Sequence, residues 1–331
     1  MYQSTLSPWP LSPPIRVRPI ASQGTNNHAR LVHTGAGDFV LKLYSAHSSA
    51  DAIRYEHGIL AWLSKQQLSF AVPAPLKTKA GATLIAVEED YAVLFHLIKG
   101  SRPRAGRSDQ LNAVGVALGE LHRCLEECSV PPREGFGSYA QVDQVHPAIP
   151  DPAALDLKDL NLPPTQGNRS LLKWWRNQID RAHSFIEKSY SSLPSQVIHG
   201  DFTPSNTLVD GTRISGIIDF EFSGPDLRAL DVAAGLKFSL RAWRPAPLWG
   251  AAAAFCHGYA SQVQLTDGEI RAIPQLIHLS DVVSTIWWLG RGIATSEPEQ
   301  HVGRLTDLCA SDRWMCANQA RLLAMMARSL S

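Results

Sequence analysis

Two carboxylates and one amide occur close together in the chain, in an arrangement that could carry phosphoryl transfer. Asp201 and Asn206 lie in the segment VIHGDFTPSNTLV (197–209), and Asp219 lies in ISGIIDFE (214–221). In-line phosphoryl transfer needs a carboxylate beside the attacking hydroxyl and oxygen ligands for a Mg²⁺ ion on the phosphates. β-type runs flank the loop between Asp201 and Asn206, and the apolar run before Asp219 would return beside them as a hairpin does. We therefore expect the three side chains to face one cleft.

Each of these residues alone is weak evidence, because an aspartate in a loop is more often a turn or cap residue. Their joint pattern is far more specific. A tripeptide HGD ending at Asp201, Asn206 five residues later, and DFE beginning at Asp219 after a hydrophobic strand together resemble the aminoglycoside phosphotransferase and homoserine-kinase-like group of the protein-kinase-like fold. The resemblance implies that Asp201 is the catalytic base and that Asn206 and Asp219 are Mg²⁺ ligands. It also implies that His199 organises the catalytic loop.

The same resemblance implies a lysine and a glutamate in the first third of the chain. Lys42 lies in the run FVLKLY, whose other members are apolar, and Glu56 follows 14 residues later on an expected helix, facing back towards the sheet. In the family, such a strand lysine and helix glutamate form an ion pair that positions the α- and β-phosphates of the nucleotide. Without the downstream motif, the two would be read as an exposed lysine and a solvated glutamate.

Two further segments are candidates for nucleotide contact. The turn QGTNN (23–27), with Gly24 and Asn26, lies between the first two expected strands, where kinases carry a glycine-rich loop whose backbone N–H groups contact phosphate. An ordinary hairpin turn explains this segment nearly as well. The run that ends at Phe95, His96 and Leu97 should lead into the hinge between lobes. In this fold the hinge backbone holds adenine between apolar walls, so these three residues are candidate adenine contacts.

Other notable residues have mostly structural interpretations. Asp231 lies near the start of a helix, where the family has an aspartate that braces the catalytic loop, so we expect it to give structural support. His122 is interpreted as a core histidine with its hydrogen bonds satisfied. Adjacent tryptophans occur at 174–175 and 287–288. Neighbouring side chains on a helix point about 100° apart, so we expect one member of each pair in the core and the other partly exposed, rather than a ligand-binding box.

The elements that must position these residues change in character near residue 98. Short β-type runs and one helix come before it, and mostly helical patterns follow, interrupted by a proline-rich irregular connection over 129–168. The expected strands are 15–22, 29–34, 39–44, 83–87 and 91–97, and the helix runs from 48 or 49 to about 66. The sequence therefore predicts an α+β, two-lobed protein-kinase-like fold. Residues 1–14 would form an N-terminal tail, 15–97 a small β-rich N-lobe, and 98–331 a larger, mostly helical C-lobe.

Local signals add detail to this outline. GAGD (35–38) is a tight hairpin signal between two strands, and Thr266 with Glu269 forms a capping box at a helix start. The acceptor substrate should lie against the helical lobe, between the catalytic loop, the helices after Asp226 and the 129–168 segment.

Composition excludes several classes of partner. The chain has 331 residues, 44% hydrophobic and 18% charged, with a formal net charge of +1. This balance gives no electrostatic reason to expect nucleic acid or an anionic membrane as a partner. No apolar stretch has the length of a signal peptide or a membrane span. The five cysteines include no CxxC pair, which favours reduced thiols and a cytoplasmic location.

Other catalytic classes fit poorly. The P-loop, HExxH and GxSxG patterns are absent. Eukaryotic-type protein kinases place arginine where this chain has Gly200, and only 11 residues separate Asp219 from Asp231, too few for a peptide-docking activation segment. A non-catalytic nucleotide-binding protein is the alternative of a different class, and its expected signature would be the loss of one of the active-site groups.

The sequence thus predicts ATP and Mg²⁺ as cofactors and a small-molecule hydroxyl as acceptor. Polycationic aminoglycosides would need an acid-rich cleft, yet from residue 240 onwards eight arginines accompany seven carboxylates. Arg241, Arg244 and Arg291 could instead hold a carboxylate bidentately. This weakly favours an amino-acid-like acceptor such as homoserine, with choline-like amines, sugars and antibiotics as alternatives.

Overall fold

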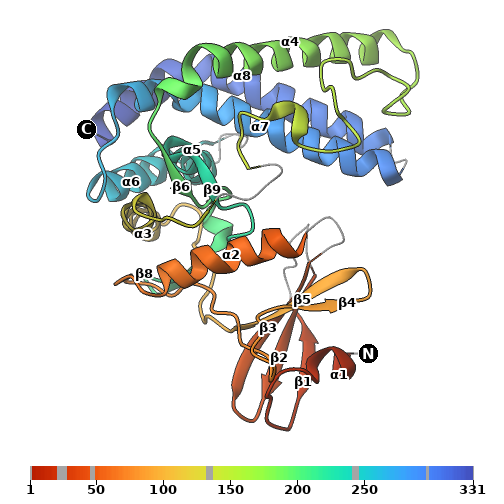
Figure 1. The fold of residues 1–331 in the computed structure, drawn as a ribbon. Coiled ribbons are helices and arrows are strands. Elements are labelled where there is room, and N and C mark those ends of the chain that lie inside the picture. The colour runs from red at the N-terminus through yellow and green to blue at the C-terminus, as the bar shows by residue number, and fades with distance from the viewer. Residues whose placement is uncertain are drawn as a thin grey trace.

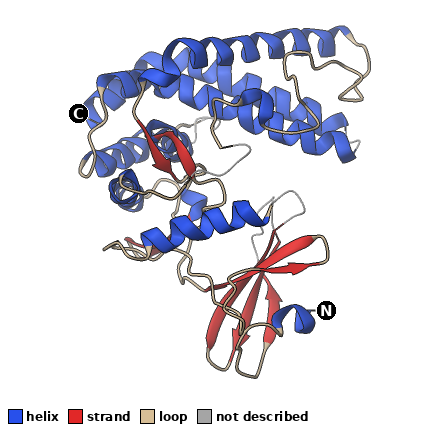
Figure 2. Cartoon of the chain, viewed as in Figure 1, coloured by secondary structure: helices blue, strands red, loops and turns tan. Residues whose placement is uncertain are grey.

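The computed structural model describes residues 2–20, 28–44, 49–131, 137–240, 246–295 and 298–330. A small lobe containing an antiparallel sheet packs against a larger lobe built mainly of helices (Figure 1). Colouring by secondary structure makes the division plain, since most of the strands gather in the small lobe (Figure 2). The predicted α+β, two-lobed fold class is therefore confirmed.

The small lobe is built on a five-stranded antiparallel sheet with the order β1-β2-β3-β5-β4. Its elements are α1 (Tyr2–Leu6), β1 (Arg16–Pro19), β2 (His28–Thr34), β3 (Gly37–Tyr44), β4 (Ile85–Val87) and β5 (Asp90–His96). The hairpin predicted at 35–38 joins β2 to β3, with Thr34 paired to Gly37. Because β3 lies between β2 and β5, Lys42 occupies the middle of the sheet, paired with Ala29 on one side and Val93 on the other.

The N-terminal segment packs on the outer face of this sheet. Leu6 and Trp9 are buried in a cluster with Val32, Leu41 and other sheet residues. The indole Nε1 of Trp9 donates a hydrogen bond to the Leu76 carbonyl at 2.9 Å. The segment that we expected to form a tail thus covers apolar side chains that would otherwise face solvent.

Helix α2 (Ala50–Leu63) covers the opposite face and links the lobes (Figure 1). Ser49 caps its start, because its hydroxyl accepts a hydrogen bond from the Ala52 N–H at 3.1 Å. Ile59 and Leu63 are buried in a cluster that continues into the helical lobe. The indole of Trp62 donates to the Cys124 carbonyl at 2.9 Å, so α2 is attached to the large lobe as well as to the sheet.

The large lobe contains six helices among the described residues and two short two-stranded sheets. The helices are α3 (Ser108–Glu126), α4 (Gln166–Ser189), α5 (Arg228–Leu240), α6 (Trp249–Ala260), α7 (Asp267–Thr295) and α8 (Pro298–Ser329). The strands are β6 (Ser195–Ile198) paired with β9 (Gly224–Leu227), and β7 (Thr207–Asp210) paired with β8 (Arg213–Ile217). The capping box at α7 is confirmed by reciprocal hydrogen bonds between Thr266 and Glu269.

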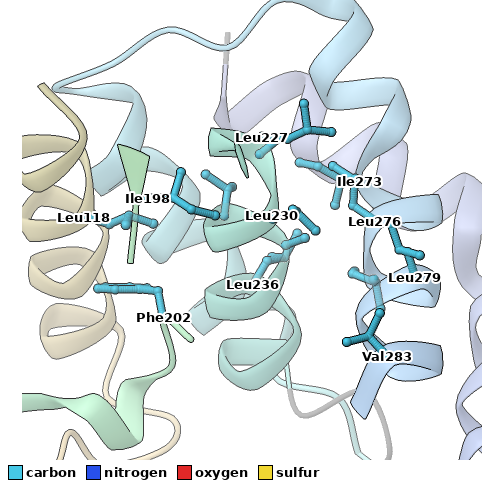
Figure 3. Close-up of a cluster of buried hydrophobic side chains, with 14 of the residues drawn as sticks. Leu118, Ile198, Phe202, Leu227, Leu230, Leu236, Ile273, Leu276, Leu279 and Val283 are labelled. Atoms are coloured by element: carbon cyan, nitrogen blue, oxygen red, sulfur yellow. The ribbon is translucent and has the colours of Figure 1, made fainter. Parts of the chain in front are cut away.

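The core of the large lobe lies between α3, α5 and α7. Figure 3 shows Leu118 of α3, Leu230 of α5 and Leu276 of α7 pointing into this shared interior, with Phe202 of the catalytic loop beside them. All four side chains are at most 3% exposed. The loop that carries Asp201 is therefore anchored by its neighbour Phe202 in the most buried part of the lobe.

Candidate active site

The catalytic loop begins where β6 ends, and its backbone is shaped by Gly200. This residue has φ +82, a left-handed conformation that favours glycine, and a Cβ there would lie 2.2 Å from the Phe222 carbonyl oxygen. Asp219, after β8, also has positive φ, at 71. The Ile218 N–H donates to the Asn206 carbonyl at 2.9 Å, which holds the residue before Asp219 against the end of the loop that carries Asp201.

Asp231 supports the loop from the first turn of α5. Its carboxylate accepts the backbone N–H of His199 at 2.8 Å and that of Gly200 at 3.0 Å. His122 Nε2 lies 3.1 Å from the same carboxylate, and His122 Nδ1 lies 3.0 Å from the Tyr259 hydroxyl. The interpretation of His122 as a satisfied core histidine is confirmed. The geometry of Asp231 is that of a brace, consistent with the role expected for it.

His199 fastens the two halves of the site to each other. Its Nε2–H donates to the Ile218 carbonyl at 3.0 Å, and its Nδ1 accepts the Asp201 N–H at 3.3 Å. These two bonds require a neutral ring, and burial lowers the pKa of His199, although Asp231 opposes that shift. A neutral His199 therefore ties the start of the catalytic loop to the residue before Asp219.

Asp201 and Asn206 contact each other directly. The Asn206 amide donates to the Asp201 carboxylate and to its carbonyl oxygen, both at 2.9 Å. Burial, reinforced by the charge of Asp219, raises the pKa of Asp201 to about 7. A carboxylate with a pKa near neutrality is suited to accept a proton from a substrate hydroxyl.

Lys42 reaches across from the sheet to the carboxylates after β8. Its ammonium lies 2.7 Å from Asp219 and 3.1 Å from Glu221, but 4.0 Å from Glu56. Burial alone would depress the pKa of Lys42, yet the surrounding carboxylates, Asp219 first, raise it above its ordinary value. Burial opposes ionisation of Asp219 as well, but Lys42 holds the pKa of that carboxyl below its ordinary value.

Glu56 is held mainly by Tyr44 rather than by Lys42. The Tyr44 hydroxyl donates to Glu56 Oε2 at 2.8 Å, and the Lys42 ammonium lies 4.5 Å from the centre of the Tyr44 ring. Burial raises the pKa of Glu56 to about 7, although Lys42 opposes that shift. The expected pair of Lys42 and Glu56 is present, but its atoms lie 4.0 Å apart, which is long for an ion pair. Tyr44 contacts both residues and was not predicted.

Two residues of this cluster were missed, Tyr44 and Glu221. Side chains two positions apart on a strand share a face, which places Tyr44 beside Lys42 on β3, so the strand period would have identified Tyr44. Glu221 lies in a turn after Asp219, whose φ is 71, and no periodic pattern marks it.

The segments expected to contact the nucleotide are only partly described. Gly24 and Asn26 lie outside the described residues, as do Arg241 and Arg244. Phe95 is buried, whereas His96 is exposed at the end of β5, and Leu97 follows it. The backbone N–H groups of His96 and Leu97 donate to the carbonyls of Ala74 and Asp38, both at 3.1 Å. Adenine contact by these three residues stays a prediction. Because the N–H groups of His96 and Leu97 are already hydrogen-bonded, such a contact would involve side chains or carbonyl oxygens.

The side chains fit the binding of a hard divalent cation beside phosphate. Because the Asn206 amide nitrogen is engaged with Asp201, its oxygen can serve as a ligand, as can Asp219. The described residues include no group of three or more His, Cys, Asp or Glu arranged to hold a metal ion. Mg²⁺ does not require such a group, since it is usually bound by one or two protein oxygens together with substrate phosphates and water.

A cavity of about 410 Å³ opens beside Asp201 in the large lobe. It lies where we expected the acceptor, between the catalytic loop, α5, α7 and the segment around Tyr139. Its charged lining residues are Asp201, Asp226, Lys237 and Asp281. No local pattern in the sequence marked Lys237 of α5 or Asp281 of α7 as members of the site.

The tryptophan pairs behave differently from each other. Trp175 is fully buried and Trp174 is partly exposed, as expected. Trp287 and Trp288 are both partly exposed and both line the cavity. The expectation was wrong for this second pair because α7 borders a cavity there, so neither side chain is covered completely.

The comparisons with known proteins agree with this geometry. Residues 16–273 match a family described as "Phosphotransferase enzyme family". The homoserine kinase of Rhodopseudomonas palustris (strain BisB5) is 28% identical over 269 residues, covering 77% of this chain and 73% of the relative.

Two solved structures share the fold. The microcompartment-associated aminopropanol kinase has a TM-score of 0.71 at 19% identity, covering 99% of this chain and 98% of its own. An aminoglycoside phosphotransferase from Alicyclobacillus acidocaldarius has a TM-score of 0.66 at 15% identity, covering 99% and 97%. The family match spans most of the chain, both lobes and every described side chain of the cluster around Lys42 and Asp201. This chain belongs to the phosphotransferase enzyme family and is a small-molecule kinase.

Proposed function

We propose that this kinase transfers the γ-phosphoryl group of ATP, as its Mg²⁺ complex, to the hydroxyl of a small amino alcohol of the homoserine type. One observation carries the proposal. Asp201 belongs both to the cluster that contains Asn206 and Asp219 and to the wall of the cavity. A hydroxyl in the cavity would therefore meet a carboxylate that also borders the phosphate side of the site.

Each residue then has a distinct role. Asp201 accepts the proton of the acceptor hydroxyl as its oxygen bonds to phosphorus, while the bond from phosphorus to the ADP oxygen breaks. Lys42 turns from Asp219 to the phosphate oxygens, and Asp219 and Asn206 hold Mg²⁺. The ion, when bound, neutralises charge on the phosphates. Positioning and charge neutralisation of this kind supply most of the acceleration in phosphoryl transfer.

Two facts support an amino alcohol as acceptor. The curated relatives of this chain include homoserine kinases at 27–29% identity, and aminopropanol kinase shares the fold over nearly the whole chain. In both names the acceptor is a short molecule with a hydroxyl and an amino group. A cavity of about 410 Å³ lies at the small end of the range for ligand sites.

The test is ADP release from Mg²⁺–ATP across a panel of homoserine, aminopropanol, choline, sugars, aminoglycosides and macrolides. Asp201→Ala should lower kcat by about 10²–10⁴ while nucleotide binding persists. Turnover with homoserine that is lost in this variant supports the proposal. Transfer only to an antibiotic or only to a sugar would refute an amino alcohol as the acceptor. Near-normal turnover in Asp201→Ala would refute the role of Asp201.

A further inference from the structure

An ion pair between two helices forms part of the cavity wall. Lys237 of α5 and Asp281 of α7 contact each other, and both line the cavity that contains Asp201. Their side chains are 22% and 12% exposed, respectively. Since they are partly shielded from water yet border the cavity, both can contact a small ligand there.

Asp281 is held in a fixed position. The Ser311 hydroxyl of α8 donates to Asp281 Oδ2 at 2.7 Å, and the Thr285 hydroxyl donates to the Asp281 backbone carbonyl at 2.7 Å. Lys237 is a flexible side chain near the end of α5. The pair therefore combines a rigid anion with a cation that can shift to meet a ligand.

The other carboxylates of the cavity are already engaged. Asp226 accepts hydrogen bonds from the Tyr190 hydroxyl and from the backbone N–H groups of Tyr139 and Leu227. Asp201 is committed to Asn206 and, under the proposed function, to the acceptor hydroxyl. Of the four charged residues that line the cavity in the described part of the chain, Lys237 and Asp281 form an ion pair with each other, and neither belongs to the catalytic loop.

One aromatic residue of the cavity wall, Trp288, already has cations of this chain beside it. The guanidinium of Arg304 lies 4.2 Å from the centre of the Trp288 ring, and that of Arg291 lies 5.5 Å from it. Cations of this chain therefore already contact Trp288, which disfavours a cage for a quaternary ammonium. Arg291 is not among the described residues that line the cavity. It would therefore act on an acceptor carboxylate only through long-range electrostatic attraction, without direct contact.

We propose that Lys237 and Asp281 bind the carboxylate and the ammonium of a zwitterionic amino acid whose side-chain hydroxyl meets Asp201. This inference rests on the proposed function and narrows it to hydroxylated amino acids. A zwitterion replaces one ion pair by two and adds no net charge to the cavity. An acceptor with only one charge would separate the pair and leave one partner shielded from water without a counter-charge, which is strongly unfavourable.

The first test uses the unaltered protein and three acceptors that share a terminal hydroxyl and differ in their charged groups. Homoserine carries both groups, γ-hydroxybutyrate only the carboxylate, and aminopropanol, as its 3-amino-1-propanol isomer, only the ammonium. We expect kcat/KM for homoserine to exceed each of the others by on the order of 10²-fold. Equal values for homoserine and aminopropanol would overturn the inference while leaving the proposed function intact. Absence of Asp201-dependent transfer to all three would overturn both.

The second test assigns the two charges to the two residues. Lys237→Met should remove the advantage of homoserine over aminopropanol, and Asp281→Asn its advantage over γ-hydroxybutyrate, mainly through KM. Arg271→Met and Asp267→Asn, at an exposed ion pair on α7 with atoms 3.8 Å apart, are the matched controls and should leave both ratios unchanged. A purely structural pair would instead lower the melting temperature and affect all three acceptors equally, which would refute the inference.

Discussion

Lys42 is surrounded by carboxylates that come from both lobes. Glu56 belongs to α2 of the small lobe, whereas Asp219 and Glu221 follow β8 of the large lobe. The motif spacing predicted that Lys42, Glu56 and Asp219 serve one site, but not which carboxylate lies nearest to the lysine. That choice depends on the rotation of long side chains in a shared cluster, which sequence spacing does not encode.

Asp219→Asn tests the proposed metal ligand with little disturbance of the backbone. Asparagine tolerates the positive φ of 71 at this position, so the main change is the loss of charge. We expect Mg²⁺-dependent nucleotide affinity, measured by titration calorimetry, to fall by at least about 10²-fold. Asp210→Asn, at the exposed last residue of β7, is the control. Unchanged affinity in Asp219→Asn would contradict the metal role.

At the level of elements, hairpins and amphipathic helices were predictable and one strand was not. The β2–β3 hairpin followed from its turn residues, and α2 from its apolar spacing. Strand β9 was missed because Gly224 and Pro225 indicate a turn, and its strand partner β6 lies upstream in the chain, beyond β7 and β8. Pairing of distant segments has no local signal, so the sequence allowed Asp226 either to cap a helix or to face the substrate, and the strand settles its place beside the cavity.

The crossing of α3 and α6 depends on two glycines. A Cβ at Gly115 would lie 2.0 Å from the Phe255 carbonyl oxygen, and one at Gly258 would lie 2.0 Å from that of Asn112. Gly115→Ala or Gly258→Ala should therefore lower the free energy of unfolding in urea by about 1–3 kcal/mol. Gly303→Ala on α8, where a Cβ meets nothing within 4 Å, should instead add about 0.5–1 kcal/mol. Equal effects at all three positions would show that the helices are not in close contact.

At the scale of the whole molecule, the two lobes share one interior. The large hydrophobic cluster includes Tyr44 and Ile59 of the small lobe together with Leu121 of α3 and Leu276 of α7. The sequence predicted two lobes from the change of composition near residue 98. It did not predict the shared core, because an amphipathic stripe shows that a face is buried but not which element covers it.

A shared core predicts that damage to the small lobe destabilises the large one. Trp9 is 1% exposed on the outer face of the sheet, and Trp9→Ala should remove about 3–5 kcal/mol of stability. The far-ultraviolet circular dichroism of the helices arises mainly from the large lobe. We expect the urea concentration at the midpoint of this signal to fall in the Trp9→Ala variant. A helical signal that keeps its midpoint would mean that the lobes unfold independently.

Stability should also depend on pH through buried histidines. Burial, aided by Arg181, lowers the pKa of His278 in α7 from 6.5 to about 4. Between these values the unfolded chain binds a proton that the folded chain does not, so stability is lost as pH falls from 6.5 to 4. The difference of 2.5 pH units corresponds to roughly 3 kcal/mol.

His278→Gln should remove this contribution. When the pH is lowered from 7 to 4, the unaltered protein should lose roughly 3 kcal/mol more unfolding free energy, measured in urea, than the variant loses. A difference that is constant over this range would show that His278 titrates alike in the folded and unfolded chains.

The position of Lys42 between the lobes has a consequence for how the enzyme senses its cofactor. Under the proposed function, a metal ion on Asp219 and a phosphate on Lys42 would each weaken the contact of 2.7 Å between these two side chains. Either change alone would leave a buried charge less well compensated, whereas both together would restore the balance. Metal and nucleotide are thus expected to be thermodynamically coupled at this site, each raising the affinity for the other. The enzyme is therefore expected to respond to the concentration of the complex, so that free ATP in excess over magnesium competes poorly for the cleft.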